Sequence, residues 1–599
     1  MKFVKNWIDG FKPAVEGFGR DPSYAADPEA DIHTFGSEKA TEMLGKDEFS
    51  NATVAVKTAD GGVAFVPEKT GLKRSLGGRH IQFIALGGSI GTGLFIGSGS
   101  NLATGGPGSL MVGFIIVAVM LITTVFGLGE LAAVLPVTGA FSTYSTRFLD
   151  PSWGFAMGYN YWLQWLVSLP LELTAATIII QFWDNKVVVP QGVWIAIGLL
   201  IMIAINLCGV RGYGEFEFFA AFLKVVGCIG FVICAIVIDC GGTPSGKYMG
   251  AQGWHQEGGA FKNGFKGFCS VFITAAFAFS GTELVGLAAA ETENPRRQLP
   301  RACKQVVLRV LIFYILSLFM ITLIVSPNLD ELNGDGNDPR ASPFVIAIQM
   351  GAIKYLPQIF NAVILVSSLS VANASVYGSS RTLLALSEQG LAPKIFRYID
   401  RQGRPLPAVV VSLLFGLLGF LIYSSNPSVI FVRFFLLSEH LLTMLQSWLL
   451  AISGLSAVFT WSSVCMAHIR FRWAWKAQGN PLELLPWASP FGQVGSWVGL
   501  ILNFLVIIAS FYAGAWPIGE GSMSGQDRAD SFFNSMLSLP VVIVFFLGHK
   551  LFTRSRFVRL SEIDIHTGRR DPVSLEVLEQ ERAEDRAKPI YLKIFDFFF

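Results

Sequence analysis

Twelve apolar segments, each long enough to cross a lipid bilayer, constrain this chain more than any other feature. A membrane-spanning helix needs about 20 predominantly apolar residues, and such a helix satisfies its own backbone hydrogen bonds in lipid. The expected fold is therefore an all-α polytopic membrane protein. The expected helices cover residues 81–103, 108–134, 155–183, 193–210, 217–239, 266–290, 304–326, 357–385, 406–424, 447–468, 495–516 and 533–553.

Charges beside these segments predict their orientation. Cytosolic loops are rich in Lys and Arg, and the connections after the sixth, eighth and tenth segments are basic, whereas the connection after the seventh is acidic. The chain then divides into a cytosolic N-terminal tail at 1–78, a transmembrane domain at 79–553 and a cytosolic C-terminal tail at 554–599. Both tails have the composition of regulatory or disordered segments. A net charge of +2 gives no reason to expect a nucleic-acid partner.

Two glycine-rich stretches interrupt the first and sixth segments. Both contain Gly-Thr-x-Leu, at Gly91 and at Gly281. Glycine inside a helix costs about 1 kcal/mol relative to alanine, and paired broken helices in two halves of a membrane protein mark a transporter's binding site. The spacing predicts a five-plus-five inverted repeat followed by two extra helices. Close helix packing through small residues is the alternative.

Broken helices of this kind suit a zwitterionic ligand. Free N–H groups at a helix start attract a carboxylate, and free carbonyl groups at a helix end attract an ammonium group. A free α-amino acid carries both charges at a fixed separation. The residues expected to bind it are Ser89, Ile90, Gly91, Thr92 and Gly93 in the first break, and Phe277, Ala278, Phe279 and Ser280 in the second.

Several longer motifs resemble a known family. They include GGSIGTGLFIGSG at 87–99, NYWLQWLVSLPLE at 160–172, FSGTELVGLAA at 279–289, ENPRRQLPRA at 293–302 and SRTLLALSEQG at 380–390. From about Gly71 onward the chain resembles fungal plasma-membrane amino acid permeases of the amino acid–polyamine–organocation superfamily, general permeases in particular.

The resemblance implies a LeuT-like fold with both termini in the cytosol, and proton-coupled uptake of amino acids across the plasma membrane by alternating access. It implies no cofactor beyond the proton and no metal. Free amino acids and the lipid bilayer are the expected partners. Family analogy also points to ubiquitin-ligase machinery acting on tail lysines such as Lys2 and Lys5.

Charged residues inside membrane helices are functional candidates. Relatives without a sodium site place a lysine where this chain has Lys224, so we expect Lys224 to couple proton movement to transport; a purely structural cation bound to first-helix carbonyls is the alternative. Glu283 either couples protons or ties the second break to neighbouring helices. Glu130 is a further coupling candidate, with hydrogen bonding to an opened backbone as its alternative.

Other pocket residues follow from the resemblance. Glu172 matches a family position near the substrate. Phe277 matches an aromatic gate over bound substrate, although a Phe in an apolar helix is usually packing. Asn373 and Ser375 are expected to line the pocket, and the pattern at 453–457 favours broad or neutral substrates.

The chain departs from the family at two places. Residues 432–446, VRFFLLSEHLLTMLQ, are an in-frame addition before the tenth helix, which we interpret as either a translated short intron or a helical extension. Phe599 stands where close relatives end in a cysteine.

Two other functions compete with broad symport: a non-transporting amino acid sensor and a narrow-specificity permease on the same fold. An enzyme is not expected, because the seven histidines form no convincing Ser/His/Asp or metal-binding pattern.

Overall fold

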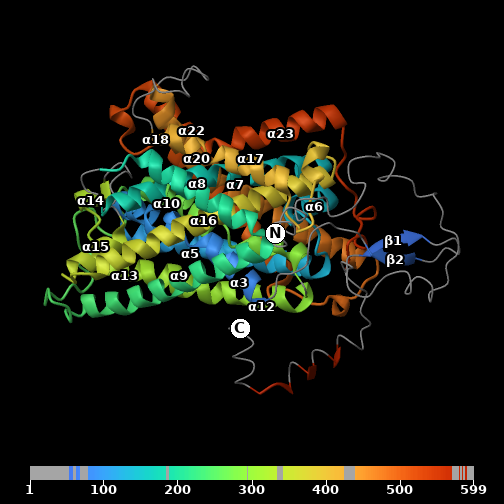
Figure 1. Ribbon diagram of the computed structural model, residues 1–599, viewed down its shortest axis with the longest axis horizontal. Helices are drawn as coiled ribbons and strands as arrows, with labels where there is room; N and C mark the ends of the chain where they lie inside the picture. The colour runs from blue at the N-terminus through green and yellow to red at the C-terminus, as the bar shows by residue number, and fades with distance from the viewer. Residues whose placement is uncertain are drawn as a thin grey trace, which may run out of the picture.

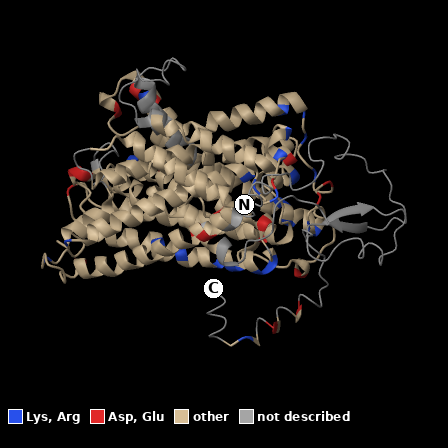
Figure 2. Ribbon diagram, viewed as in Figure 1, with Lys and Arg blue, Asp and Glu red and all other residues tan. Residues whose placement is uncertain are grey.

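The computed structural model describes residues 53–57, 63–67, 78–183, 188–292, 294–333, 342–423 and 439–569, with short stretches at 579–580, 583–584 and 587–589. Long helices lie side by side in one bundle (Figure 1). Most Lys, Arg, Asp and Glu residues lie toward its ends, and its middle is mostly uncharged (Figure 2). The expected tail lysines, Phe599 and residues 432–438 lie outside the described residues.

The first half of the bundle contains both sides of the first break. Its elements are α3 (Gly78–Ser89), α4 (Thr92–Phe95), α5 (Gly97–Val134), α6 (Ala140–Phe148), α7 (Pro151–Gln181), α8 (Gln191–Leu207), α9 (Gly209–Asp239) and η2 (Gln252–Trp254). Gly106, with φ 79° and Pro107 next to it, kinks α5, because proline lacks the N–H that continues a helix. The C-terminal end of the first expected span and all of the second lie on one kinked helix.

The second half of the bundle begins with the other broken helix. Its elements are α10 (Gly264–Phe279), α11 (Leu284–Leu287), η3 (Ala288–Glu291), α12 (Pro295–Arg309), the π-helical η4 (Val310–Leu316), α13 (Ser317–Ile324), α14 (Asp330–Asn333), α15 (Pro343–Met350), α16 (Leu356–Glu388) and η5 (Lys394–Arg397). The remaining elements are α17 (Leu406–Phe415), α18 (Leu418–Tyr423), α20 (Glu439–Ala477), η6 (Leu482–Leu484), α21 (Gly492–Ala515), η7 (Glu520–Ser522), α22 (Gly525–Met536) and α23 (Ser538–Thr553).

All twelve expected spans coincide with helices, which confirms the all-α polytopic fold. Within the described residues, seven helices are individually long and apolar enough to cross a membrane, and the bent pair α22 and α23 makes an eighth. The fourth and ninth spans are shorter apolar helices. Residues 439–446 form the first turns of α20, and both interpretations of the addition stay predictions.

A β-hairpin occurs in the segment expected to be an irregular N-terminal tail. Strand β1 (Thr53–Lys57) pairs antiparallel with β2 (Val63–Pro67), with Thr53 opposite Pro67. Both strands are rich in apolar residues, and Asp60-Gly61-Gly62 lies between them. Such a pattern is a hairpin signal, so the sequence contained the evidence for this element.

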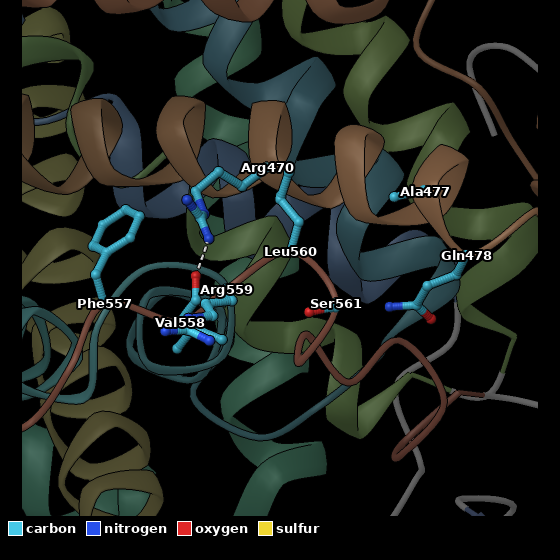
Figure 3. A pocket seen from close by; sticks show the side chains of 8 residues that line it. All are labelled: Arg470, Ala477, Gln478, Phe557, Val558, Arg559, Leu560 and Ser561. Carbon is cyan, nitrogen blue, oxygen red and sulfur yellow. Dashed lines mark hydrogen bonds between the residues drawn. The ribbon is translucent and has the colours of Figure 1, made fainter.

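The beginning of the C-terminal tail packs against one end of the bundle. The N–H of Val558 donates to the carbonyl of Leu149 at 2.9 Å. Arg470 of α20 donates from Nε to the carbonyl of Phe148 at 2.5 Å, and its guanidinium also donates to the carbonyl of Val558 (Figure 3). Arg470 therefore fastens the tail to the turn that precedes α7.

Asp150, the N-cap of α7, joins the same contact. Its carboxylate accepts from the N–H of Ser152 at 2.7 Å and from the hydroxyl of Ser555 at 2.7 Å, and it pairs with Lys550. Burial alone would raise the pKa of Asp150, but the hydrogen bonds from Lys550, Ser555 and Ser152 outweigh it and lower the pKa. The carboxylate thus stays charged at neutral pH.

We expect Arg470→Ala to release the tail, because the substitution removes hydrogen bonds to two carbonyl groups at once. Hydrogen bonds to charged groups contribute about 1.5–3 kcal/mol each, so local opening should rise about tenfold or more. Chymotrypsin cleavage after Phe557, which is exposed, measures that opening. Arg528→Ala is the control, since Arg528 binds the carbonyl of Glu520 in the last turns before α22. Equal cleavage of all three proteins would contradict the role of Arg470.

Candidate substrate site at the two helix breaks

Both predicted helix breaks are present. Helix α3 ends at Ser89, and Gly91 is extended (φ −142°, ψ −156°) before α4 starts at Thr92. Helix α10 ends at Phe279, Ser280 is extended (φ −57°, ψ 144°), and Gly281 has φ 98°. The first N–H groups of a helix have no partner within it, so the break before α4 leaves polar backbone inside the bundle.

The two breaks lie directly against each other. A Cβ on Gly281 would be 2.2 Å from the carbonyl oxygen of Gly88, and a Cβ on Gly93 would be 2.8 Å from Cα of Ala278. These short distances show that close packing, the alternative explanation of these glycines, applies in addition to the helix breaks. The glycines both open the helices and let the openings meet.

Tyr314 bridges the breaks, and sequence reasoning missed it. Its hydroxyl lies 2.8 Å from the carbonyl oxygen of Ser89 and 2.9 Å from that of Ala278. The residue sits in the π-helical η4, a distortion that is frequent at functional sites. A tyrosine within an apolar span has nothing in the sequence that distinguishes such a bridging role from ordinary packing.

A small buried cavity of about 10 Å³ lies at the meeting point of the breaks. Its expected lining residues are Ser89, Gly91, Gly93, Glu172, Phe277 and Ser280. Its further lining residues are Gly88, Trp165, Ser168 and Val371. This volume is the space for about one water molecule. A larger ligand would need the site to open.

Glu172 is the carboxylate of this cavity and is almost fully buried. It accepts hydrogen bonds from the hydroxyl of Thr92 at 2.7 Å and from that of Ser368 at 2.9 Å. Thr92 therefore ties the first break to α7. Phe277 is half-buried with its ring against Gly93, a placement compatible with a gate; the gate itself stays a prediction.

Glu283 lies beside the second break. Its carboxylate oxygens lie 3.1 and 3.2 Å from the backbone nitrogen of Gly281, and the Trp461 indole donates to it at 3.3 Å. Tyr161 approaches the same carboxylate at 3.5 Å. These contacts favour the interpretation in which Glu283 ties the opened backbone to α7 and α20.

Glu130 lies outside the cavity lining. Its carboxylate contacts Arg472 at 2.5 Å and His468 at 3.1 Å on α20. It also accepts from the N–H of Ser489 at 2.7 Å. The cluster joins α5 to α20 and to the connection before α21, so its geometry favours a structural role.

Lys224 is fully buried and reaches the first broken helix. Its ammonium group donates to the carbonyl of Gly87 at 2.6 Å and to the hydroxyl of Ser370 at 3.0 Å. Glu217, which sequence reasoning missed, accepts from Ser370 at 2.6 Å and from Asn373 at 2.8 Å. Asn373 thus faces this network.

The remaining expected site residues do not line the cavity. Ser375 donates to the carbonyl of Val371 within its own helix at 2.8 Å. The breaks and Glu172 form the ligand side of the site, and Lys224 and Glu217 form a separate ionic network behind it. The residues that belong to the breaks without lining the cavity are Ile90, Thr92, Ala278 and Phe279.

Comparison with known proteins agrees with this architecture. The family model described as amino acid permease matches residues 80–562. The general amino-acid permease GAP2 of Candida albicans is 47% identical over 89% of this chain and 88% of its own length. The general amino-acid permease GAP1 of Saccharomyces cerevisiae is 46% identical over 89% and 87%. The cationic amino acid transporter 1 of Schizosaccharomyces pombe is 45% identical over 88% and 86%. This chain belongs to the amino acid permease family.

Proposed function

We propose that this protein is a plasma-membrane amino acid permease that couples proton entry to uptake of L-amino acids by alternating access, with both termini in the cytosol. The observation that carries the proposal is the meeting of two opened helices at one buried cavity. Opened backbone of this kind offers N–H and C=O groups to a zwitterion. Similarity to general permeases supports the same substrate class.

Proton coupling is the finer part of the proposal. A buried lysine can shift its protonation readily, and Lys224 touches the broken helix that would move during transport. Broad specificity is supported by the likeness to two general permeases. The similarity to a cationic transporter makes a narrow range the second candidate.

Uptake of labelled L-alanine, L-leucine, L-lysine and L-glutamate by permease-deficient cells tests the proposal, with and without a proton gradient. We expect uptake of more than one amino acid and its collapse when the gradient is removed. No uptake despite surface expression would refute transport and favour a sensor. Uptake of a single amino acid would support the narrow range, and uptake indifferent to the gradient would refute proton coupling.

A further inference from the structure

Lys224 and Glu217 form a hydrogen-bonded relay through one hydroxyl. Both side chains are fully buried on α9, and seven positions place them two turns apart on one face. The Lys224 ammonium donates to Ser370 Oγ at 3.0 Å, and Ser370 donates onward to Glu217 Oε2 at 2.6 Å. Donor and acceptor alternate in one direction, from the lysine to the carboxylate.

Two amide side chains connect Glu217 to the α8–α9 end of the bundle, and because their N–H groups donate toward Glu217 they position its carboxylate and do not carry its proton. Asn373 donates to Glu217 Oε1 at 2.8 Å, and Asn206 donates to the amide oxygen of Asn373 at 3.1 Å. Asn206 lines a second cavity, of about 10 Å³, near the connection between α8 and α9. The other lining residues of this cavity are Gly209, Tyr213, Tyr377, Arg381, Arg404 and Val409.

The second cavity is polar and electrically balanced. Arg381 pairs with Glu291 at 2.9 Å, and Arg404 pairs with Asp400 at 2.5 Å. Among the described residues, the buried hydroxyl of Tyr213 has no hydrogen-bond partner. An unsatisfied polar group beside a polar cavity is where buried water binds, so this cavity suits water that can accept a proton.

We propose that Glu217 receives the coupling proton from Lys224 through the hydroxyl of Ser370 and releases it to a water molecule that reaches it from the Asn206–Tyr213 cavity, past Tyr213 one turn away on the same face of α9. An N–H proton of Lys224 moves to Ser370 Oγ while the hydroxyl proton of Ser370 moves to Glu217. The products are a neutral amine and a neutral carboxylic acid. The acid then loses its proton to water and is a carboxylate again. The inference rests on the proton coupling proposed above.

The relay also touches the part of the site that must move. A Cβ on Gly87 would lie 2.1 Å from Glu217 Oε2, and Gly87 accepts directly from Lys224. Movement of α3 therefore changes both ends of the relay together. The other titratable groups near it are Glu172 and Cys228, which interact with Lys224, and Tyr213, which interacts with Glu217.

The test uses the full-length protein in proteoliposomes and the amino acid with the highest uptake in the panel above. Glu217→Gln keeps the size of the side chain and one of its two acceptor oxygens but cannot carry a proton. We expect accumulation driven by a pH gradient to fall about tenfold or more, within the range for a lost proton-transfer group. Exchange of internal for external amino acid, which needs no net proton movement, should continue.

Ser370 provides a graded version of the same test. Ser370→Ala removes the relay hydroxyl and should slow gradient-driven uptake, whereas Ser370→Thr keeps a hydroxyl and should restore it. Glu215→Gln is the matched control, because Glu215 is an exposed glutamate two residues away on α9.

The outcomes separate this inference from the proposed function. If the wild type ignores the gradient, the proposed coupling itself fails, and the relay with it. If the wild type responds and Glu217→Gln accumulates equally well, the coupling stands and the relay is refuted. Loss of exchange together with accumulation in Glu217→Gln would show a structural carboxylate and would also overturn the inference.

Discussion

Gly281→Ala is expected to prevent formation of a stable, active protein. Gly281 has φ 98°, and an alanine Cβ would lie 2.2 Å from the carbonyl oxygen and 2.5 Å from the carbonyl carbon of Gly88. Backbone strain at such a φ costs about 1–3 kcal/mol, and overpacking costs about the same again. The clash is with backbone, which no rotamer change relieves. The melting temperature in detergent and the amount of protein at the cell surface measure the effect.

Gly230→Ala is the control for the Gly281 substitution. Gly230 lies in α9, and a Cβ at this position would have no group from outside its own helix turn within 4 Å. Alanine favours a helix by about 1 kcal/mol over glycine, so this variant should be as stable as the wild type or more stable. A Gly281→Ala protein with wild-type melting temperature and uptake would show that the two breaks do not need their present contact.

Lys224→Ala is expected to impair concentrative uptake strongly while leaving equilibrium binding within about threefold, since the cavity residues are untouched. The substitution removes the donor to Gly87 and Ser370 and leaves Glu217 buried without its nearby cation. Gradient-driven accumulation should fall about tenfold or more. Binding of the labelled amino acid to purified protein and its accumulation in proteoliposomes are the two measurements.

Breaking a buried charge pair can itself cost about 3–5 kcal/mol, so Lys224→Gln, which retains a hydrogen-bond donor, accompanies the alanine variant. Lys354→Ala is the surface control, because Lys354 is exposed next to Tyr355. Unchanged accumulation in the folded Lys224 variants would remove this lysine from the mechanism.

The elements that the sequence predicted best are those set by local pattern. Apolar length located the twelve spans, and the two Gly-Thr-x-Leu motifs located the breaks. Lys224 stood out because a lysine within an apolar helix is costly wherever it points. Glu217 escaped notice because the expected helix began at that residue, and a charge at a helix end has an ordinary explanation in solvent.

Contacts between distant segments were harder to foresee. Asn373 and Ser375 were both expected at the cavity, and neither lines it: Asn373 donates to Glu217, and Ser375 donates to the carbonyl of Val371 within its own helix. The structure separates two faces of α16: Ser368 and Val371 face Glu172 and the cavity, and Ser370 and Asn373 face Glu217. Only the packing of α16 against α7 and α9 decides which of its faces meets Glu172 and which meets Glu217.

The Tyr314 hydroxyl has one hydrogen but faces two carbonyl oxygens, those of Ser89 and Ala278. A hydroxyl donates a single hydrogen, so at any instant one of these carbonyls lacks a full donor. Tyr314 is therefore a donor that the two breaks share: its single hydrogen serves one carbonyl at a time, so a shift of one break relative to the other changes which break holds it.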